Sequence, residues 1–398
     1  MNAAASIPHP DPSIVAPTVA GVALVTGFLF LDIGARQALL FLIGIGLGVV
    51  LLHAAFGFTS GWRLLVRERR GAGVRAQLLL LALTSILFFP VLGGLFSGLG
   101  AAGAVAPASV SVAVGAFLFG VGMQLGGGCG SGTLFTVGGG QVRMLITLAF
   151  FVIGSLAATA HLHWWGALPS LGEVSLVSGL GWLPGLALQL AVLAVLYAGV
   201  RALERRRHGV AEALAPARPS AGGRWLTGPW PLWWGVIGLA ALNLATLLVA
   251  GHPWSITFAF GLWGAKIASA LGVDVAAWPY WSAGYPAQAL GHSVLADTTS
   301  LMDFGIILGA VLAAGLAGRF APETRLRWND VATAVIGGLL LGYGARLAFG
   351  CNIGALLAGI ASGSLHGWLW LVTGFLGGLA GVRLRVAFGI DRPPGRAA

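Results

Sequence analysis

The only two cysteines of this 398-residue chain stand in similar glycine-rich segments. Cys129 lies in GGGCGSG, residues 126–132, and Cys351 lies in LGYGARLAFGCNIGALLAG, residues 341–359. A thiol donates a weak hydrogen bond, and glycine lets backbone N–H groups approach a solute closely. A helix that starts just after each cysteine would also point its positive N-terminal end at the same place. The pattern therefore predicts contacts with a small anion.

The two cysteines occupy equivalent places in an internal repeat. A shift of 222 positions lays the first segment over the second and pairs Gly120, Gly122, Gly128, Cys129 and Gly132 with Gly342, Gly344, Gly350, Cys351 and Gly354. The later segments IGSLAAT (153–159) and LGGLAGV (376–382) also agree. Earlier in each half, FGFTSGW (56–62) resembles WSITFAF (254–260) and pairs Thr59 with Thr257. A buried cysteine is often only a small apolar filler, but filling space does not explain this paired placement.

The composition is that of an integral membrane protein. Hydrophobic residues make up 57% of the chain and charged residues 9%, with a mean hydropathy of +0.90, whereas soluble domains are about 25% charged. The long apolar stretches lack the alternation of barrel strands, so the predicted fold class is all-α and polytopic. The net charge of +10 then serves membrane orientation and headgroup contact, and no nucleic acid partner is expected.

Ten spanning helices are predicted from these apolar stretches. They cover residues 17–34, 37–56, 76–92, 110–125, 143–163, 184–201, 231–250, 303–320, 330–349 and 366–388. Two further apolar stretches, 57–62 and 253–272, are short or interrupted by Gly and Pro, which predicts re-entrant or broken helices.

Arginines are concentrated in alternate loops, at 63–75, 201–224 and 319–327, and in the C-terminal tail. The positive-inside rule places these loops and both termini in the cytoplasm, and the protein in the inner membrane. The helix before Cys129 then runs inward and the helix before Cys351 runs outward. The two repeats are therefore predicted to be inverted, with broken helices that meet at a central passage.

This organisation divides the chain into three parts. Residues 1–200 form a first membrane half whose repeat covers about 37–165, and residues 201–228 form a basic cytoplasmic linker. Residues 229–398 form a second membrane half whose repeat covers about 231–388.

Candidate residues for the anion path surround the cysteines and the broken helices. The set is Gly57, Thr59, Ser60, Gln124, Gly128, Cys129, Gly130, Ser131, Thr257, Arg346, Gly350, Cys351 and Asn352. Arg346, one turn before Cys351, is interpreted as the counter-charge of an oxyanion, as a structural partner of Asp303, or as a side chain that snorkels to headgroups. Asp297 and Asp303 precede an apolar helix and are interpreted as caps. No cluster has metal-ligand spacing, so no metal or other cofactor is expected.

These segments resemble the YeeE/YedE family of membrane proteins, also described as the sulfur-transport family. The strongest element is GARLAFGCNIGALLAGIASGSLHGW, residues 344–368, and the others are GGGCGSGTL, AFGFTSGWR and HPWSITFAFGLWGAK. The resemblance implies thiosulfate or a related sulfur species as cargo, with thiol contacts at Cys129 and Cys351. Thiosulfate-importing relatives carry a third cysteine in a pattern like GFCFASAFR, where this chain has Gly57. Thr59 or Ser60 would supply a hydroxyl donor near that place.

The predicted function is that of an inner-membrane permease, not an enzyme, for a small sulfur-containing anion such as thiosulfate. Its expected partners are that anion, the lipid bilayer and a cytoplasmic sulfur-carrier protein. The alternative is a membrane thiol oxidoreductase or sulfur transferase that uses the two cysteines as a redox pair. Channel-like passage and alternating access both remain open, because no pair of acidic residues in the helices marks a coupling site.

Overall fold

The computed structural model describes residues 9–96, 98, 100–215, 224–322 and 325–391. Helices dominate it. The first part contains α1 (Pro12–Phe28), the π-turn η1 (Leu29–Ile33), α2 (Ala35–His53), α3 (Phe58–Glu68), α4 (Ala72–Leu92), α5 (Val110–Gly126), α6 (Gly130–Gly138), α7 (Val142–Gly166), α8 (Leu176–Leu180) and α9 (Trp182–His208). Two short strands, β1 (Pro107–Ser109) and β2 (Ser170–Glu173), form an antiparallel pair.

The second part is also helical. It contains α10 (Arg224–Thr227), α11 (Leu232–Ala250), α12 (Thr257–Ala270), the turn η2 (Val275–Ala277), α13 (Gly284–Gly291), the turn η3 (Val294–Ala296), α14 (Thr298–Leu316), α15 (Trp328–Leu347), the π-turn η4 (Asn352–Leu357), α16 (Ala358–Ala361) and α17 (Leu365–Ala387).

Within the described ranges, ten helical segments are long and apolar enough to cross a membrane. Each of them overlaps one of the ten predicted spans, so the all-α, polytopic fold class is confirmed. Four of the segments contain more than one helical piece: Pro12–Ile33 joins α1 and η1, Ala35–Glu68 joins α2 and α3, Val110–Gly138 joins α5 and α6, and Trp328–Ala361 joins α15, η4 and α16. The two segments that carry Cys129 and Cys351 are among these four.

Helices from the two parts of the chain interleave. The most extensive contacts join α2 to α14, α5 to α17, and α15 to both α5 and α7. Glycine allows these pairs to approach until backbone meets backbone: a β-carbon added at Gly44 would lie 2.5 Å from the Met302 carbonyl oxygen, and one added at Gly305 would lie 2.6 Å from that of Phe41. Close backbone approach at small residues is the usual way in which helices associate in a membrane.

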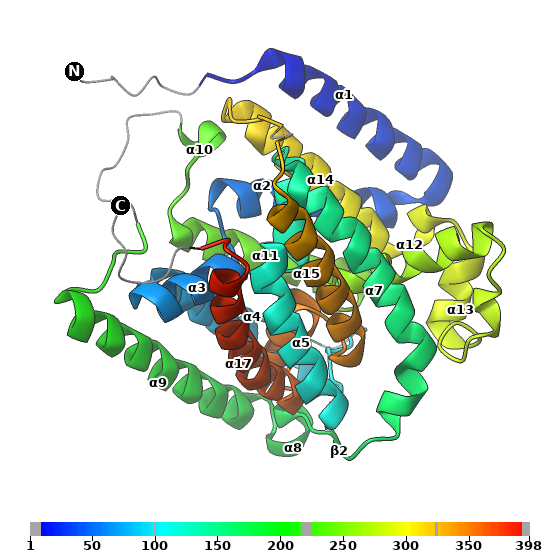
Figure 1. The fold of residues 1–398 in the computed structure, drawn as a ribbon. Coiled ribbons are helices and arrows are strands. Elements are labelled where there is room, and N and C mark those ends of the chain that lie inside the picture. Colours follow the sequence, from blue (N-terminus) through cyan, green and yellow to red (C-terminus); the bar gives the residue numbers. More distant parts are fainter. Residues whose placement is uncertain (1–8, 97, 99, 216–223, 323–324, 392–398) are drawn as a thin grey trace.

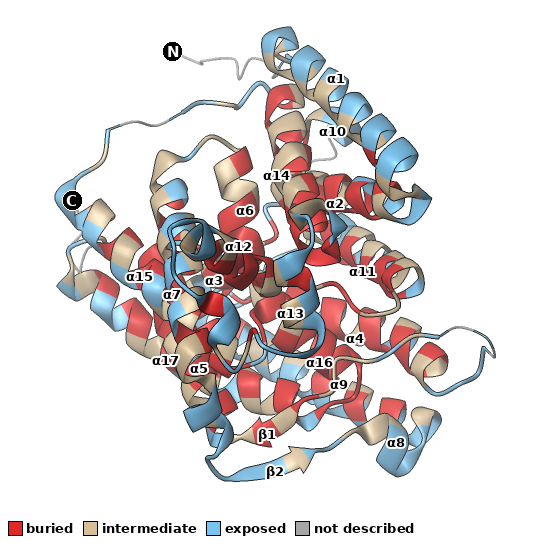
Figure 2. Ribbon diagram, turned by 90° about the vertical axis from the view of Figure 1, so that its right-hand side faces the viewer, coloured by how far each residue is buried: buried red, intermediate tan, exposed pale blue. Residues whose placement is uncertain are grey.

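The main core cluster joins residues of the short helices α3, α6 and α12 to residues of the long helices around them, and Figure 2 shows buried segments of α6 and α12 near the middle of the molecule. By contrast, α1 runs along the edge of the bundle and has no buried residue (Figure 1). Its apolar side chains suit contact with lipid, because a soluble protein would expose polar side chains on such a face. The core thus combines short and long helices, and α1 lies outside it.

Two predictions about local structure are wrong. Asp303 does not precede a helix: α14 begins at Thr298, and the cap is Asp297, whose Oδ2 accepts from the Ser300 N–H at 2.8 Å. Asp303 lies in the helix interior instead. The arginine-rich loop also starts later than residue 63, because α3 continues to Glu68 and carries Arg63 and Arg67 on the helix.

Substitution of Gly309 tests the close contact between α14 and α2. A β-carbon at this position would lie 2.9 Å from the Ile45 Cα, where the backbone cannot move aside. We expect Gly309→Ala to destabilise the fold by about 1–3 kcal/mol, as overpacking of a core does. The matched control is Gly199→Ala on the exposed face of α9, where no atom lies within 4 Å. Thermal unfolding midpoints in detergent measure both, and equal midpoints would contradict the packing argument.

Candidate functional site

The two cysteines have the same local structure. Cys129 is the N-cap of α6 with φ −84° and ψ −165°, and Cys351 is the N-cap of η4 with φ −97° and ψ −165°. The Cys129 Sγ accepts from the Gly132 N–H at 3.4 Å, and the Cys351 Sγ accepts from the Ile353 N–H at 3.4 Å. The side chains are only 1% and 0% exposed. Each thiol therefore faces the free N–H groups at the start of a helical turn.

The glycines beside the cysteines have no room for a side chain. A β-carbon added at Gly128 would lie 3.0 Å from the Thr133 nitrogen, and one added at Gly350 would lie 2.8 Å from the Ala355 nitrogen. In both places the chain folds tightly back on the helical turn that follows the cysteine. The two predicted glycine-rich segments thus form equivalent tight turns.

The structure brings the two thiol turns together. A β-carbon added at Gly130, next to Cys129, would lie 3.0 Å from the Cys351 Sγ and 3.5 Å from the Ile256 Cγ2. Thr257 begins α12 directly after Ile256 and is buried. The backbone of Phe58, the first residue of α3, lies beside the Cys129 thiol. The starts of α3, α6, α12 and η4 therefore converge on one small volume.

Several polar atoms next to this volume have no partner. Both side-chain atoms of Asn352, the Thr59 Oγ1 and the Gln124 Oε1 are buried without a hydrogen bond. The Ser131 Oγ contacts the Cys129 Sγ at 3.5 Å, and the Gln124 Nε2 donates to the Thr59 carbonyl oxygen at 3.2 Å. Buried polar groups are normally satisfied, so unpaired groups in one place indicate a site for a polar ligand or water.

A pocket reaches this region from the side of α4 and the linker. Its volume is about 170 Å³, and its lining includes Gly57, Ser60, Arg70, Gln77 and Glu212. Gly57 is the N-cap of α3 and precedes Phe58, so the pocket lies beside the start of α3.

Arg346 contacts a different set of residues. Its Nη1 donates to the Tyr280 Oη at 3.0 Å, and its guanidinium carbon lies 5.9 Å from the Phe258 ring centroid and 6.0 Å from that of Tyr280. No ion pair joins it to Asp303 in the part of the chain that the structure describes. Phe258 follows Thr257, so Arg346 lies beside the first turn of α12.

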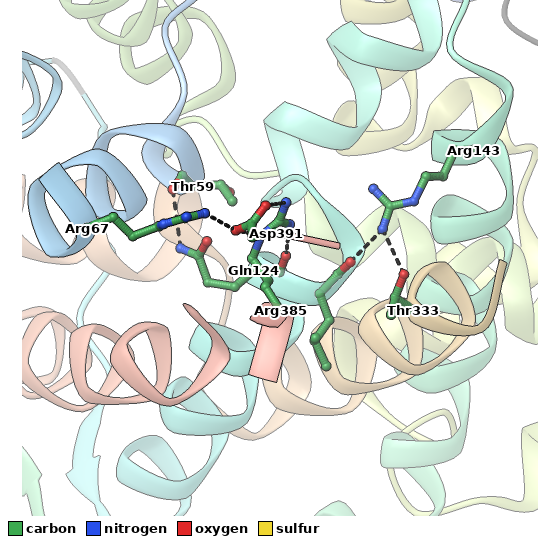
Figure 3. Close-up of polar contacts among 8 residues, drawn as sticks. Thr59, Arg67, Gln124, Arg143, Thr333, Arg385 and Asp391 are labelled. Carbon is green, nitrogen blue, oxygen red and sulfur yellow. Dashed lines mark hydrogen bonds and ion pairs between the residues drawn. The ribbon is translucent and has the colours of Figure 1, made fainter. Parts of the chain in front are cut away.

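Arginines hold the broken end of α5 (Figure 3). The Arg385 Nη1 donates to the Gln124 carbonyl oxygen at 2.6 Å, and the Arg143 Nη2 donates to that of Leu125 at 2.7 Å. The Thr147 Oγ1 donates to the Gly126 carbonyl oxygen at 3.2 Å. A helix end leaves its last carbonyls without intrahelical donors, and cations favour that end of the helix dipole. These bonds therefore allow α5 to stop before Cys129 without unsatisfied backbone.

One carboxylate ties this anchor to α3. Asp391 accepts from the Arg385 Nε and Nη2 at 2.8 and 2.9 Å, and it pairs with the Arg67 Nη1 at 2.6 Å (Figure 3). The hydrogen bonds from Arg385 and the positive charges around it hold the pKa of Asp391 below its ordinary value. The network links α3, α5 and α17 at the end of the bundle where the Cys129 turn begins.

Fold and site together define a polytopic membrane protein whose broken helices meet at two buried thiols. The chain belongs to the family described as sulphur transport, which matches residues 53–380. The predicted membership of the YeeE/YedE family is thereby confirmed.

Individual relatives match over different shares of their length. The chain is 32% identical to the probable transporter YedE of Escherichia coli over 162 residues, which cover 40% of this chain and 39% of that relative. It is 28% identical to the thiosulfate transporter TsuA of Spirochaeta thermophila over 366 residues, 84% of this chain and 95% of the relative. It is 24% identical to TsuA of Escherichia coli over 361 residues, 83% and 89% respectively. The match to YedE thus spans about two fifths of that relative.

The structure places at or near the site three residues whose positions or roles the sequence did not predict. Asp303, interpreted from the sequence as a cap or as a partner of Arg346, is fully buried in α14, and both carboxylate oxygens lack a partner among the described residues. Arg385 and Asp391 form the anchor described above; from the sequence, Arg385 was counted only among the arginines of the C-terminal tail, and Asp391 was assigned no role. An acidic residue six positions into an apolar helix was the available signal for Asp303. The position of Arg385 in the sequence did not indicate its hydrogen bond to the Gln124 carbonyl oxygen.

Asp391→Asn tests the anchor through its dependence on pH. Because the folded-state pKa is lowered, the stabilisation is complete above the ordinary pKa of aspartate, about 3.9, and is lost as the pH falls through the lower folded-state value. We expect the variant to unfold at a lower temperature than the wild type at neutral pH. We expect this difference to shrink below pH of about 4. Asp274→Asn, at an exposed carboxylate, is the control, and a difference that does not change with pH would refute the charge argument.

Proposed function

We propose that this chain is an inner-membrane permease that passes a small sulfur-containing anion, with thiosulfate as the first candidate, between Cys129 and Cys351. It is not an enzyme in this proposal. The observation that carries the proposal is the pair of equivalent cysteine turns, both buried and side by side, at the point where four helix starts converge. Helix starts offer N–H donors and a positive dipole end to an anion.

The chemistry of this volume suits transient binding. The donors available are two thiols, backbone N–H groups and the unpartnered amide of Asn352. All of these are neutral, and no ion pair of the described residues includes a side chain from the thiol turns. A path must bind its solute strongly enough to admit it and weakly enough to release it. Neutral donors meet both needs, and a thiol is also a soft partner for a sulfur atom.

The relatives support the class of cargo. Two proteins named thiosulfate transporters align with more than four fifths of this chain. On this basis the cargo is a sulfur anion that carries both sulfur and oxygen acceptors. Lipid surrounds the helices, and a cytoplasmic sulfur-carrier protein would receive the cargo at the side of the Gly57 pocket, where the arginine-rich linker lies.

The packing of the helices supports the inverted repeat as part of this proposal. In the repeat, α5 and α7 correspond to α15 and α17, and α5 packs on α17 while α15 packs on α7. The earlier segments follow the same rule, since α2 packs on α14 while α11 packs on α4. Such reciprocal contacts arise when two related halves, 1–200 and 229–398, face each other across an axis in the membrane plane.

Uptake of labelled thiosulfate by cells that lack their own importer tests the proposal. We expect Cys129→Ala and Cys351→Ala each to reduce the uptake rate by about tenfold or more, because each removes one hydrogen bond to the anion and a hydrogen bond worth about 1.4 kcal/mol corresponds to that factor. The control is Thr246→Val, which removes a buried hydroxyl that bonds only within its own helix, to Leu242. All variants are compared at equal amounts of folded protein.

Three outcomes separate the candidates. No uptake by the folded wild-type chain removes thiosulfate as cargo. Unchanged uptake in both cysteine variants removes the thiol path. A disulfide that forms between Cys129 and Cys351 during turnover would instead favour the redox alternative, in which the pair acts as an oxidoreductase.

Gly57 offers a second test. The thiosulfate-importing relatives that this chain resembles carry a cysteine at that position. A β-carbon at Gly57 would lie 2.8 Å from the Ser60 Oγ, which is the end of a rotatable side chain. We expect Gly57→Cys to fold and to raise thiosulfate uptake by up to about tenfold, the effect of one additional hydrogen bond. Gly57→Ala adds the same β-carbon without the thiol and should not raise uptake. Equal uptake by the two variants would show that a third thiol does not serve the path.

A further inference from the structure

Asp303 is a buried acid on the face of α14 that packs on α6, the helix that begins directly after Cys129. Its side chain is 0% exposed, and neither carboxylate oxygen has a hydrogen-bond partner among the described residues. Residues 303, 307 and 310 share one helix face, and a β-carbon at Gly138 of α6 would lie 2.5 Å from the Ile307 carbonyl oxygen and 2.6 Å from the Ala310 Cβ. Asp303 also lies close enough to Cys351 to interact with it electrostatically.

No cation balances this acid within the described residues. The elements that pack on α14 are α1, α2, α6, α10, α12 and η3, and α1, α6 and η3 carry no titratable side chain. The groups to consider are therefore Arg36 and His53 on α2, Arg224 on α10, Lys266 on α12, Asp297 at the cap of α14, and the thiols of Cys129 and Cys351.

The cations on α2 and α12 are bound elsewhere. Arg36 donates to the carbonyl oxygens of Val249 and Ala250, and Lys266 donates to those of Leu290 and His292. Neither forms an ion pair with Asp303. The carboxylate of Asp297 carries a like charge, which disfavours the ionised form of Asp303.

The neutral form of Asp303 is therefore the stable one in this structure. An ionised carboxylate without a cation in a protein interior costs several kcal/mol, and such a group takes up a proton instead. A protonated carboxyl has an O–H donor, which an ionised carboxylate lacks. Next to a path for an anion, the first form would attract the solute and the second would repel it.

We propose that Asp303 is a proton-binding residue of the anion path, and that the anion binds only when Asp303 carries its proton. The inference rests on the proposed permease function. The O–H of Asp303 then donates to the anion beside the Cys351 turn, together with the unpartnered amide of Asn352. Loss of the proton to water leaves an unbalanced carboxylate that expels the anion. No other bond is formed or broken.

Linkage gives this site a measurable consequence. If a proton on Asp303 raises the affinity for the anion, a bound anion must hold the proton more tightly by the same factor. The anion and the proton therefore travel in the same direction, and acid on the outer side favours uptake. Asp303 alone would then couple the movement of the anion to that of the proton, so a pair of acidic residues is not required.

Uptake of labelled thiosulfate by the full chain in liposomes tests the inference. The external pH is varied between about 6 and about 9, a range in which ordinary carboxylates do not titrate. We expect wild-type uptake to fall at least about tenfold toward the alkaline end, and a pH-sensitive dye inside the liposomes to report acidification during uptake. If one proton is required, the uptake rate can fall by at most about tenfold for each pH unit.

Substitutions at Asp303 separate its proton from its place in the packing. Asp303→Asn keeps an N–H donor without a titrating proton, so we expect uptake that no longer changes with pH and no acidification. Asp303→Leu removes the donor and should abolish uptake. The control is Glu204→Gln, at an equally buried acid that pairs with Arg75 at 2.9 Å on α4 and α9. It should keep the wild-type pH profile.

The outcomes distinguish this inference from the proposed function. A pH profile in Asp303→Asn that matches the wild type, or wild-type uptake in Asp303→Leu, refutes the inference and leaves the permease intact. Absence of uptake by the wild type at every pH refutes the permease and the inference with it. Size-exclusion elution identifies folded variants, and if Asp303→Leu does not fold, the Asn profile decides.

Discussion

The structure depends on one constraint: a helix that ends in the buried interior of the protein must have its last carbonyl groups satisfied by protein donors. At the end of α5 the donors are Arg385, Arg143 and Thr147. At the end of α15 the Ser111 Oγ donates to the Leu347 carbonyl oxygen at 2.9 Å, and the Trp370 Nε1 donates to that of Gly350 at 3.3 Å. Only because these bonds exist can each helix end before its cysteine and present the next turn's N–H groups to a thiol.

Close helix packing supplies these donors at the right distance. Ser111 reaches α15 from α5, and Trp370 reaches the Cys351 turn from α17. Such contacts require that backbones approach one another, which glycine permits on α2, α14 and their partners. A larger residue at these positions would separate the helices and remove the donors from the carbonyls. The glycines thus position the site, although most of them lie outside it.

The arginine side chains lie around the thiol turns and not within them. Arginines cap carbonyl groups and pair with Asp391 at one end of the bundle, and Arg346 contacts aromatic rings beside α12. The thiol turns themselves offer neutral donors. A solute anion would therefore meet positive charge near the pocket and only dipoles between the cysteines. Near these neutral groups, Asp303 is an acid with no hydrogen-bond partner among the described residues.

The sequence by itself determined the class of the protein, the ten spans and the equivalence of Cys129 and Cys351, because hydropathy and spacing are local properties of the chain. It also located the Gly57 turn, Thr257 and Asn352, which the fold brings close to the thiols. Tertiary structure alone decided that Arg346 meets Tyr280 and not Asp303, that Arg385 caps α5, and that Asp303 is buried with no hydrogen-bond partner among the described residues. These contacts depend on which distant helix lies beside each side chain. The contact of α5 with α17, for example, joins residues about 260 positions apart, so no local sequence pattern predicts it.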